Sequence, residues 1–412
     1  MTNRYPTCRA RRAPLACLIT LLCWSGAEHA RAVEADPAPH GSPTAAAIVH
    51  LAGNSFCDAG GPFLGLGASY FLALRDAKDD PQQLDENLGL LASRGFNFVR
   101  IFTMVSWDGL EIAPVSFTNR SGRVVPPWSD YWTHFRDLLQ ALGKHGMRAA
   151  ITIFADAQLI MPAEASRRGH LDLLLDALAG LEGQVIYLEV ANEAWQNGFP
   201  GTQGVSELRS LADYLAGRTA LLVAITSNDD TSDEGIASLY RGSAADVATV
   251  HFSRDTRKPE GGWFPVRDAY RMDLPDVPPL ISNEPIGPGS SVGSETDPIK
   301  LCSAAAFAFL ANLPGYVFHS RAGIYGYQKC CPPGGDRLLF EHTLGIEAFR
   351  HLPTWRIGCG MTESGLERPS RSFAMDGQIS IGLTSPGRQT AASGTSGAPG
   401  QSALSVYPWE ST

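Results

Sequence analysis

Short apolar segments alternate with amphipathic segments along residues 62–351, and this alternation limits the possible folds more than any other feature of the chain. Each apolar segment has the length and composition of a buried β-strand. The segments between them carry apolar residues at helical spacing, as Leu84, Leu88 and Leu91 illustrate. The predicted strands are 62–68, 96–102, 147–154, 184–191, 219–225, 246–252, 278–282 and 315–320. The predicted helices are 81–94, 128–146, 163–181, 205–216, 233–241, 264–271, 299–311 and 338–351.

Near-continuous apolar strands separated by helices are typical of a parallel sheet that is buried on both faces. Eight strand–helix units predict an α/β fold, a (β/α)8 TIM barrel formed by residues 48–360. An open, doubly wound sheet is the competing fold. It is disfavoured because residues 63–69 (FLGLGAS) lack the third glycine of a dinucleotide-binding loop and are not followed directly by a helix.

The two ends of the chain differ in composition from the predicted barrel. Residues 1–32 read as a signal peptide, with a basic stretch of Arg9, Arg11 and Arg12 before an apolar run at 13–24 and the sequence Ala-Arg-Ala at 30–32. A membrane anchor is the alternative, although the apolar run is short for a bilayer span. Residues 33–47 are expected to be a flexible leader, and residues 361–412 a low-complexity tail with possible short strands at 372–383 and 403–409. The protein is therefore expected to be secreted or periplasmic.

Charge and hydropathy exclude several classes of partner. The net charge of −9 disfavours a protein that binds nucleic acid through phosphate contacts. After residues 1–32, no segment offers 18 uninterrupted apolar residues, so no stable membrane span is expected in the mature chain. The sequence contains no feature that predicts an oligomeric state.

Five of the eight cysteines lie beyond the predicted signal peptide: Cys57, Cys302, Cys330, Cys331 and Cys359. Export would permit disulfides. One possible pairing joins Cys302 to either Cys330 or Cys331, and Cys57 to Cys359. Buried thiols are the alternative, and an odd count leaves one cysteine over in any case.

In a (β/α)8 barrel the active site lies at the carboxyl ends of the strands, so the polar residues there are the candidates for chemistry. Two glutamates stand out, Glu193 after the fourth strand and Glu284 after the seventh, and each follows an asparagine. Strand ends three units apart can face each other across the barrel mouth. A facing pair of carboxyls is what cleavage of a glycosidic bond requires, one protonated and the other ionised.

These residues resemble a known family. The order of Arg100 on strand two, Asn192-Glu193 on strand four, His251 on strand six and Glu284 on strand seven is similar to the retaining (β/α)8 glycoside hydrolases of the cellulase and mannanase type. The resemblance covers residues 50–355. It implies that Glu193 is the acid/base and Glu284 the nucleophile. It also implies that Asn192 binds the sugar 2-hydroxyl, that Arg100 keeps the nucleophile ionised and that His251 lines the catalytic subsite.

The sequence departs from this family at three strand ends. Asp156 follows strand three where the family often has histidine, and Ser253 stands where a tyrosine usually holds the nucleophile. Phe318-His319 stand where a tryptophan often stacks on the sugar. These departures motivate the alternative of a non-catalytic carbohydrate-binding or cell-envelope protein on a degenerate barrel.

Two tryptophans near the predicted mouth, Trp107 and Trp195, are candidates for stacking on a sugar ring, with ordinary packing as the alternative. No zinc motif is present, and carboxylate-driven hydrolysis needs no cofactor, so neither a metal nor a cofactor is predicted. The prediction from sequence is therefore a secreted hydrolase of β-linked oligo- or polysaccharides.

Overall fold

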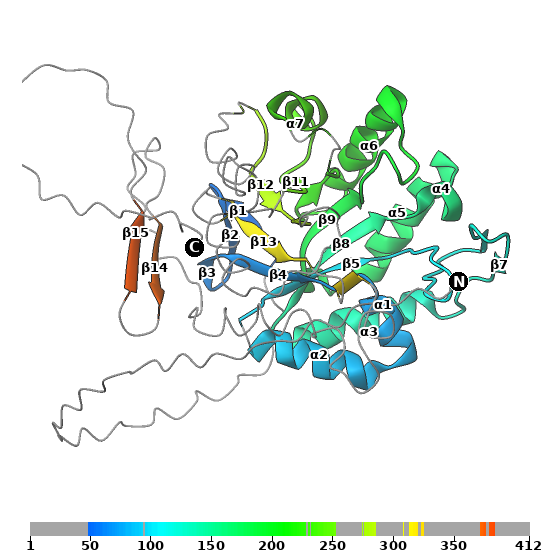
Figure 1. Cartoon of the computed structure of the whole chain (residues 1–412), viewed down its shortest axis with the longest axis horizontal. Helices are drawn as coiled ribbons and strands as arrows, with labels where there is room; N and C mark the ends of the chain where they lie inside the picture. Colours follow the sequence, from blue (N-terminus) through cyan, green and yellow to red (C-terminus); the bar gives the residue numbers. More distant parts are fainter. Residues whose placement is uncertain are drawn as a thin grey trace, which may run out of the picture. The chain divides into compact units, whose positions relative to one another are not determined.

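Eight parallel strands form a nearly closed barrel, which confirms the predicted α/β fold (Figure 1). This computed structural model describes residues 48–93, 95–227, 230, 232–252, 274, 276–285, 308, 313–319, 323–324, 371–375 and 379–383. The barrel strands are β4 (Gly65–Ser69), β5 (Phe98–Phe102), β8 (Arg148–Phe154), β9 (Val185–Ala191), β10 (Val223–Ala224), β11 (Ala248–Val250), β12 (Leu280–Ser282) and β13 (Gly315–Phe318). They pair in the order β10-β9-β8-β5-β4-β13-β12-β11, so the first and last barrel strands, β4 and β13, are neighbours.

The seam between β10 and β11 is closed by a helix side chain as well as by the backbone. The carbonyl of Val223 accepts hydrogen bonds from the amides of Asp246 (2.8 Å) and Val247 (3.2 Å). The hydroxyl of Tyr240 accepts from the amides of Thr226 and Thr249, both at 3.1 Å, and donates to the carbonyl of Thr226 at 2.6 Å. Tyr240 thereby satisfies backbone groups that a regular ladder would pair.

The helices lie around the outside of the parallel strands (Figure 1). Their amphipathic pattern explains this position, because in α3 the buried residues Tyr131, Phe135, Leu138, Leu139 and Leu142 form one stripe against the barrel. The helices are α1 (Ala73–Asp79), α2 (Pro81–Ser93), α3 (Tyr131–Lys144), α4 (Ala157–Ile160), α5 (Glu164–Leu178), α6 (Gly201–Ala216) and α7 (Asp233–Tyr240), with a 3-10 turn at Glu182–Gln184.

The predicted first strand, 62–68, is wrong at its beginning. Residues 61–63 belong to a separate antiparallel sheet of β1 (His50–Ala52), β2 (Ser55–Asp58) and β3 (Gly61–Phe63). This sheet brings Phe56 against the barrel interior, where a Cβ at Gly65 would lie only 2.9 Å from its ring. The chain leaves this sheet after β3, and Gly65 pairs instead with the segment before β13. Its amide donates a hydrogen bond to the carbonyl of Pro314.

Two layers of side chains fill the barrel interior. Phe98, Tyr187, Ile281 and Val317 belong to a buried apolar cluster that also contains Phe56. Two positions further along every strand the residue is polar, and successive side chains on one face of a strand are two residues apart. The polar residues are Ser69, Arg100, Thr152, Glu189, Thr226, Thr249, Asn283 and His319, all nearly or fully buried. This polar layer forms the floor on which the candidate site stands.

The structure differs from some other predictions and does not describe the residues of several more. The predicted strand 219–225 shortens to the two residues of β10, and a two-stranded hairpin of β6 (Phe117–Thr118) and β7 (Val124–Val125) lies within the loop that follows β5. In the tail, β14 (Arg371–Met375) and β15 (Ile379–Leu383) pair as antiparallel strands. The predicted signal peptide 1–32, leader 33–47, helices 264–271 and 338–351, and strand 403–409 lie outside the described residues. Of the predicted helix 299–311 only Ala308 is described, and it is helical and buried. Within the described part of the chain, no helix is long and apolar enough to cross a membrane.

Cys57 is buried on β2. The other four cysteines of the possible disulfides, Cys302, Cys330, Cys331 and Cys359, lie outside the residues that the structure describes. Both the pairing and its alternative therefore stay predictions.

Candidate active site

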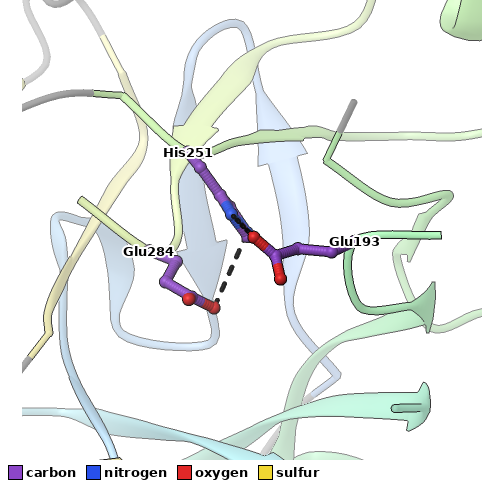
Figure 2. A group of neighbouring side chains, drawn as sticks. All are labelled: Glu193, His251 and Glu284. Carbon is purple, nitrogen blue, oxygen red and sulfur yellow. Dashed lines mark ion pairs between the residues drawn. The ribbon is translucent and has the colours of Figure 1, made fainter. Parts of the chain in front are cut away.

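The structure brings the two predicted glutamates together at the carboxyl end of the barrel, with His251 between them (Figure 2). Glu193 lies two residues beyond β9, and Glu284 lies two residues beyond β12. One carboxylate oxygen of each glutamate and one ring nitrogen of His251 all lie within 4.8 Å of one another. The side chain of Glu193 is 23% exposed, whereas that of Glu284 is 5% exposed, so Glu193 is the more accessible carboxyl.

Backbone strain fixes the direction of Glu193. Its φ angle is +35°, in the left-handed region that residues with a side chain rarely adopt. The side-chain amide of Asn197 stabilises this turn by donating to the carbonyls of Asn192 (2.7 Å) and Glu193 (3.3 Å). The hydroxyl of Thr226 accepts from the amide of Ala194 at 3.3 Å. Non-glycine residues held in this way cluster at functional sites.

Arg100 on β5 links three strands, because its guanidinium contacts side chains on or just beyond β9 and β12. Its Nη1 atom donates to Oε2 of Glu284 at 2.6 Å, and its Nη2 atom donates to Oδ1 of Asn192 at 2.8 Å. The guanidinium is fully buried, and its carbon lies 5.3 Å from the ring centroid of Phe71. Burial acts to lower the pKa of Arg100, but the carboxylates of Glu189 and Glu284 outweigh it and raise that pKa above its ordinary value.

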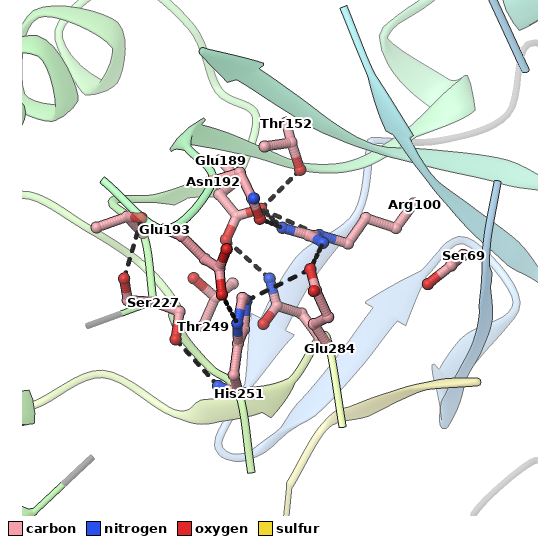
Figure 3. Close-up of polar contacts among 12 residues, drawn as sticks. Ser69, Arg100, Thr152, Glu189, Asn192, Glu193, Ser227, Thr249, His251 and Glu284 are labelled. Atoms are coloured by element: carbon pink, nitrogen blue, oxygen red, sulfur yellow. Dashed lines mark hydrogen bonds and ion pairs between the residues drawn. The ribbon is translucent and has the colours of Figure 1, made fainter. Parts of the chain in front are cut away.

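Sequence reasoning missed Glu189, which lies at the centre of the polar layer (Figure 3). Its Oε2 atom accepts from Arg100 Nε (3.2 Å), Arg100 Nη2 (2.8 Å) and Thr152 Oγ1 (2.6 Å), and its Oε1 atom accepts from Asn283 Nδ2 (2.8 Å). Glu189 is fully buried. The signal was present in the sequence, because a glutamate inside an apolar strand is almost never buried without a partner.

His251 faces both catalytic candidates with different ring atoms. Its Nδ1 atom lies 3.4 Å from Oε1 of Glu193, and its Nε2 atom lies 3.7 Å from Oε2 of Glu284. Burial acts to raise the pKa of Glu193, but the contact with His251 lowers it below the ordinary value. Burial raises the pKa of Glu284, and the charge of Glu193 adds to this, against the opposing charges of His251 and Arg100. These surroundings favour the ionised form of Glu193 and the neutral form of Glu284.

Two of the three residues at which the sequence departs from the family pattern, His319 and Asp156, are described by the structure. His319, one residue beyond β13, is fully buried, with Nδ1 2.8 Å from Ser69 Oγ and Nε2 3.5 Å from Glu284 Oε1. Asp156, after β8, accepts a hydrogen bond from the amide of Ser106 at 2.9 Å, and burial raises the pKa of its carboxyl. Ser253 lies outside the described residues.

The two predicted sugar-stacking residues follow barrel strands that carry site residues, Trp107 after β5 and Trp195 after β9. Trp107 is half-buried and packs edge-to-face on Phe102, with ring centroids 6.5 Å apart. Trp195 is half-buried two residues after Glu193. Their stacking on a sugar stays a prediction, as does the contact of Asn192 with a sugar hydroxyl.

Among the described residues, one group has the donor atoms to hold a metal ion: Glu193, His251 and Glu284. Two carboxylates and an imidazole suit a divalent transition metal. The shortest contacts of His251 use different ring nitrogens, with Nδ1 beside Glu193 and Nε2 beside Glu284, so the imidazole faces each carboxylate with a separate proton-carrying atom. The arrangement therefore fits a proton-transfer pair better than a dedicated metal site.

The fold is similar to those of several solved structures. An endo-1,4-β-mannanase from Rhizomucor miehei has a TM-score of 0.52 at 14% identity, and the alignment covers 74% of this chain and 99% of that chain. An exo-β-1,4-mannosidase from an Opitutaceae bacterium has a TM-score of 0.51 at 16% identity, covering 72% of this chain and 61% of that chain. Gas2p of Saccharomyces cerevisiae, solved with laminaritetraose and laminaripentaose, has a TM-score of 0.51 at 14% identity, covering 75% of this chain and 68% of that chain.

At these identities the likeness shows a shared barrel fold. No protein-family model and no curated protein sequence matches the chain. Function must therefore be argued from the site.

Proposed function

We propose that this chain is a retaining glycoside hydrolase in which Glu193 is the acid/base and Glu284 is the nucleophile. The observation that carries the proposal is the approach of the two carboxyls, whose nearest oxygens lie within 4.8 Å together with His251. Retaining enzymes hold their carboxyls about 5–5.5 Å apart, whereas inverting enzymes need about 6.5–9.5 Å to admit a water between them. The spacing in this site supports direct attack by a carboxylate on the sugar.

The surroundings of the two glutamates support the proposed roles of acid/base and nucleophile. Glu284 is buried and its Oε2 atom accepts the 2.6 Å hydrogen bond from Arg100, which orients a carboxylate and stabilises its charge. Glu193 is the more exposed carboxyl, on a turn at the barrel mouth where a leaving group and later a water can reach it. An acid/base must exchange protons with solvent-accessible groups, whereas a nucleophile needs a fixed direction of attack.

The reaction requires Glu193 to be protonated while Glu284 is ionised. In the empty site His251 lowers the pKa of Glu193 and burial raises that of Glu284. A sugar bound over the site would remove water mainly from Glu193, because Glu284 is already buried. Loss of water favours the neutral form of a carboxyl, so substrate binding would move the proton toward Glu193.

The chemistry then proceeds in two displacements. Glu193 donates its proton to the glycosidic oxygen while an oxygen of Glu284 attacks the anomeric carbon, so that the bond to the leaving group breaks and a glycosyl ester forms. Glu193, now ionised, takes a proton from water as that water attacks the same carbon. The ester bond to Glu284 breaks, which restores both carboxyls and releases a sugar with retained configuration. Asn192, whose Oδ1 atom accepts from Arg100, would present its amide N–H groups to a sugar hydroxyl.

We also propose a β-linked oligo- or polysaccharide as the substrate. The names of the structural neighbours concern β-1,4-mannan-cleaving enzymes and a protein solved with laminari-oligosaccharides. Export directed by residues 1–32 would bring the enzyme to such polymers outside the cytoplasm. β-1,4-Mannan, laminarin and carboxymethylcellulose are accordingly the first three polymers to test.

The experiment is to measure reducing-sugar release from these polymers with the wild type, Glu193→Ala and Glu284→Ala, followed by rescue with azide on an activated aryl glycoside. Glu284→Ala should yield a glycosyl azide of inverted configuration, because azide replaces the nucleophile. Glu193→Ala should yield one of retained configuration, because azide then attacks the glycosyl ester. Folded wild-type protein that binds a polymer without releasing sugar would instead favour the carbohydrate-binding alternative.

A further inference from the structure

His319 lies between the first and seventh barrel strands because the ring order places β13 between β4 and β12. Phe318 pairs with Ala68, so the next residue, His319, comes beside Ser69. On the other side, β12 leads directly to Glu284. The two nitrogens of an imidazole point to opposite edges of the ring, and here they meet these two neighbours: Nδ1 lies 2.8 Å from Ser69 Oγ and Nε2 lies 3.5 Å from Glu284 Oε1.

We propose that Ser69 and His319 form a positioning pair that holds the second carboxylate oxygen of Glu284, opposite the oxygen held by Arg100. Arg100 donates to Oε2, and the imidazole faces Oε1. Both supporting groups pack near Phe71, since the His319 ring centroid lies 5.7 Å from that of Phe71 and the Arg100 guanidinium carbon lies 5.3 Å from it. The inference rests on the proposed function, because it concerns the nucleophile of that reaction.

The protonation of the pair follows from its neighbours. A lone pair on Nε2 would face a carboxylate oxygen and repel it, so Nε2 carries a proton. Nδ1 can then accept from the Ser69 hydroxyl, which can donate and accept hydrogen bonds. The 3.5 Å contact in the empty site is long, and such contacts shorten when the substrate is bound.

No other described residue is seen to approach Oε1 of Glu284 in this way. In the described part of the chain, the charged and titratable groups that face Glu284 are Arg100 from β5, Glu193 beyond β9, His251 beyond β11 and His319 beyond β13. Arg100 and His251 both lie nearest to Oε2. Among the described residues, His319 is thus the donor that faces Oε1, and loss of its N–H group removes that contact.

The test uses the full-length protein and its best substrate from the three polymers above. His319→Leu removes the donor, His319→Gln keeps an N–H group, and Ser69→Ala leaves the imidazole without its partner. We expect kcat of His319→Leu to fall about 10- to 100-fold, the range for a lost hydrogen bond to a charged group, with KM changed less than about 2-fold. The acid limb of its pH–rate profile should move to higher pH, since a carboxylate that loses a donor binds its proton more tightly.

His319→Gln should recover part of both changes, and Ser69→Ala should show smaller changes in the same direction. His145→Gln is the matched control, because His145 ends α3 before β8, at the opposite end of the strands, and pairs with Asp85. It should leave kcat and the acid limb unchanged.

An unchanged acid limb in His319→Leu overturns the inference. This holds whether kcat is retained or falls because the variant is less stable. If His319→Leu does not fold, an unchanged acid limb in Ser69→Ala has the same meaning. Full activity of Glu284→Ala would instead overturn the proposed function, so the two failures can be told apart.

Discussion

Replacement of Glu189 by glutamine would test whether Glu189 and Glu284 share the buried positive charge of Arg100. Both Glu189 and Glu284 accept hydrogen bonds from this one guanidinium, at 2.8 and 2.6 Å. Glutamine has the shape of glutamate but only one acceptor oxygen. With that oxygen toward Arg100, its amide N–H groups would face Asn283. The Oδ1 atom of Asn283 has no hydrogen-bond partner among the described residues and could accept after the amide rotates.

The magnitudes follow from this geometry. Hydrogen bonds to a charged group contribute about 1.5–3 kcal/mol, against about 1 kcal/mol for neutral ones, so Glu189→Gln should lower the free energy of unfolding by about 2–3 kcal/mol. Glu189→Leu leaves Arg100, Thr152 and Asn283 without their acceptor and should cost about 3–5 kcal/mol. In Glu189→Gln the charge of Arg100 is no longer shared with the carboxylate of Glu189, so the pKa of Glu284 should fall.

Denaturant unfolding and the pH dependence of kcat/KM measure these two effects. The acid limb reports ionisation of the nucleophile, and the wild-type limb should lie above the ordinary glutamate pKa because burial raises the pKa of Glu284. Glu189→Gln should move that limb to lower pH. Glu207→Gln is the matched control, since Glu207 pairs with another buried arginine, Arg167, at 2.7 Å. An acid limb that stays in place, or moves upward, would refute a charge shared between Glu189 and Glu284.

Three other predictions concern the seam, the core and the candidate metal ligands. Tyr240→Phe should lower the free energy of unfolding by about 2–4 kcal/mol in denaturant titration, because it leaves two buried amides unpaired; a loss below the error of the titration would contradict this role. Burial lowers the pKa of His170 to about 4, so the folded protein should lose stability as pH falls from about 6.5 toward 4, by up to about 3 kcal/mol. The variant His170→Leu should lack this part of the pH dependence, and parallel stability curves for the two proteins would disprove the assignment. Zinc should inhibit competitively through Glu193, His251 and Glu284, and EDTA should restore activity; inhibition that persists unchanged in His251→Ala would place the zinc elsewhere.

Much of the barrel could be predicted from local sequence because its elements depend on local periodicity. The stripe of Leu84, Leu88 and Leu91 predicted a helix at 81–94, and α2 runs from Pro81 to Ser93. Strand 184–191 became β9 at Val185–Ala191, since seven consecutive buried residues leave little choice of face. Where backbone pairing depends on a distant partner, as at β10, the predicted strand was too long.

The candidate site divides in the same way. Glu193 and Glu284 could be found because the active site of a barrel lies at the carboxyl ends of its strands. Arg100 lies inside β5 and was recognised through the family resemblance. Glu189 was missed because it lies inside a strand, where its role depends on three donors from other strands. The left-handed turn at Glu193 was also unreadable, because it is stabilised by contacts with Asn197 and Thr226 rather than by its own residue type.

Local periodicity was enough to predict most of the barrel strands and helices, and each barrel strand leads to a polar residue two positions beyond a residue of the layer below. Which of these polar residues contact one another depends on how the strands are ordered in space. Ser69 and His319 are 250 residues apart, and in an open sheet the first and last strands need not be neighbours. They touch because the strands form a ring in which β4 pairs with β13, and ring formation depends on the packing of the whole barrel rather than on any one segment.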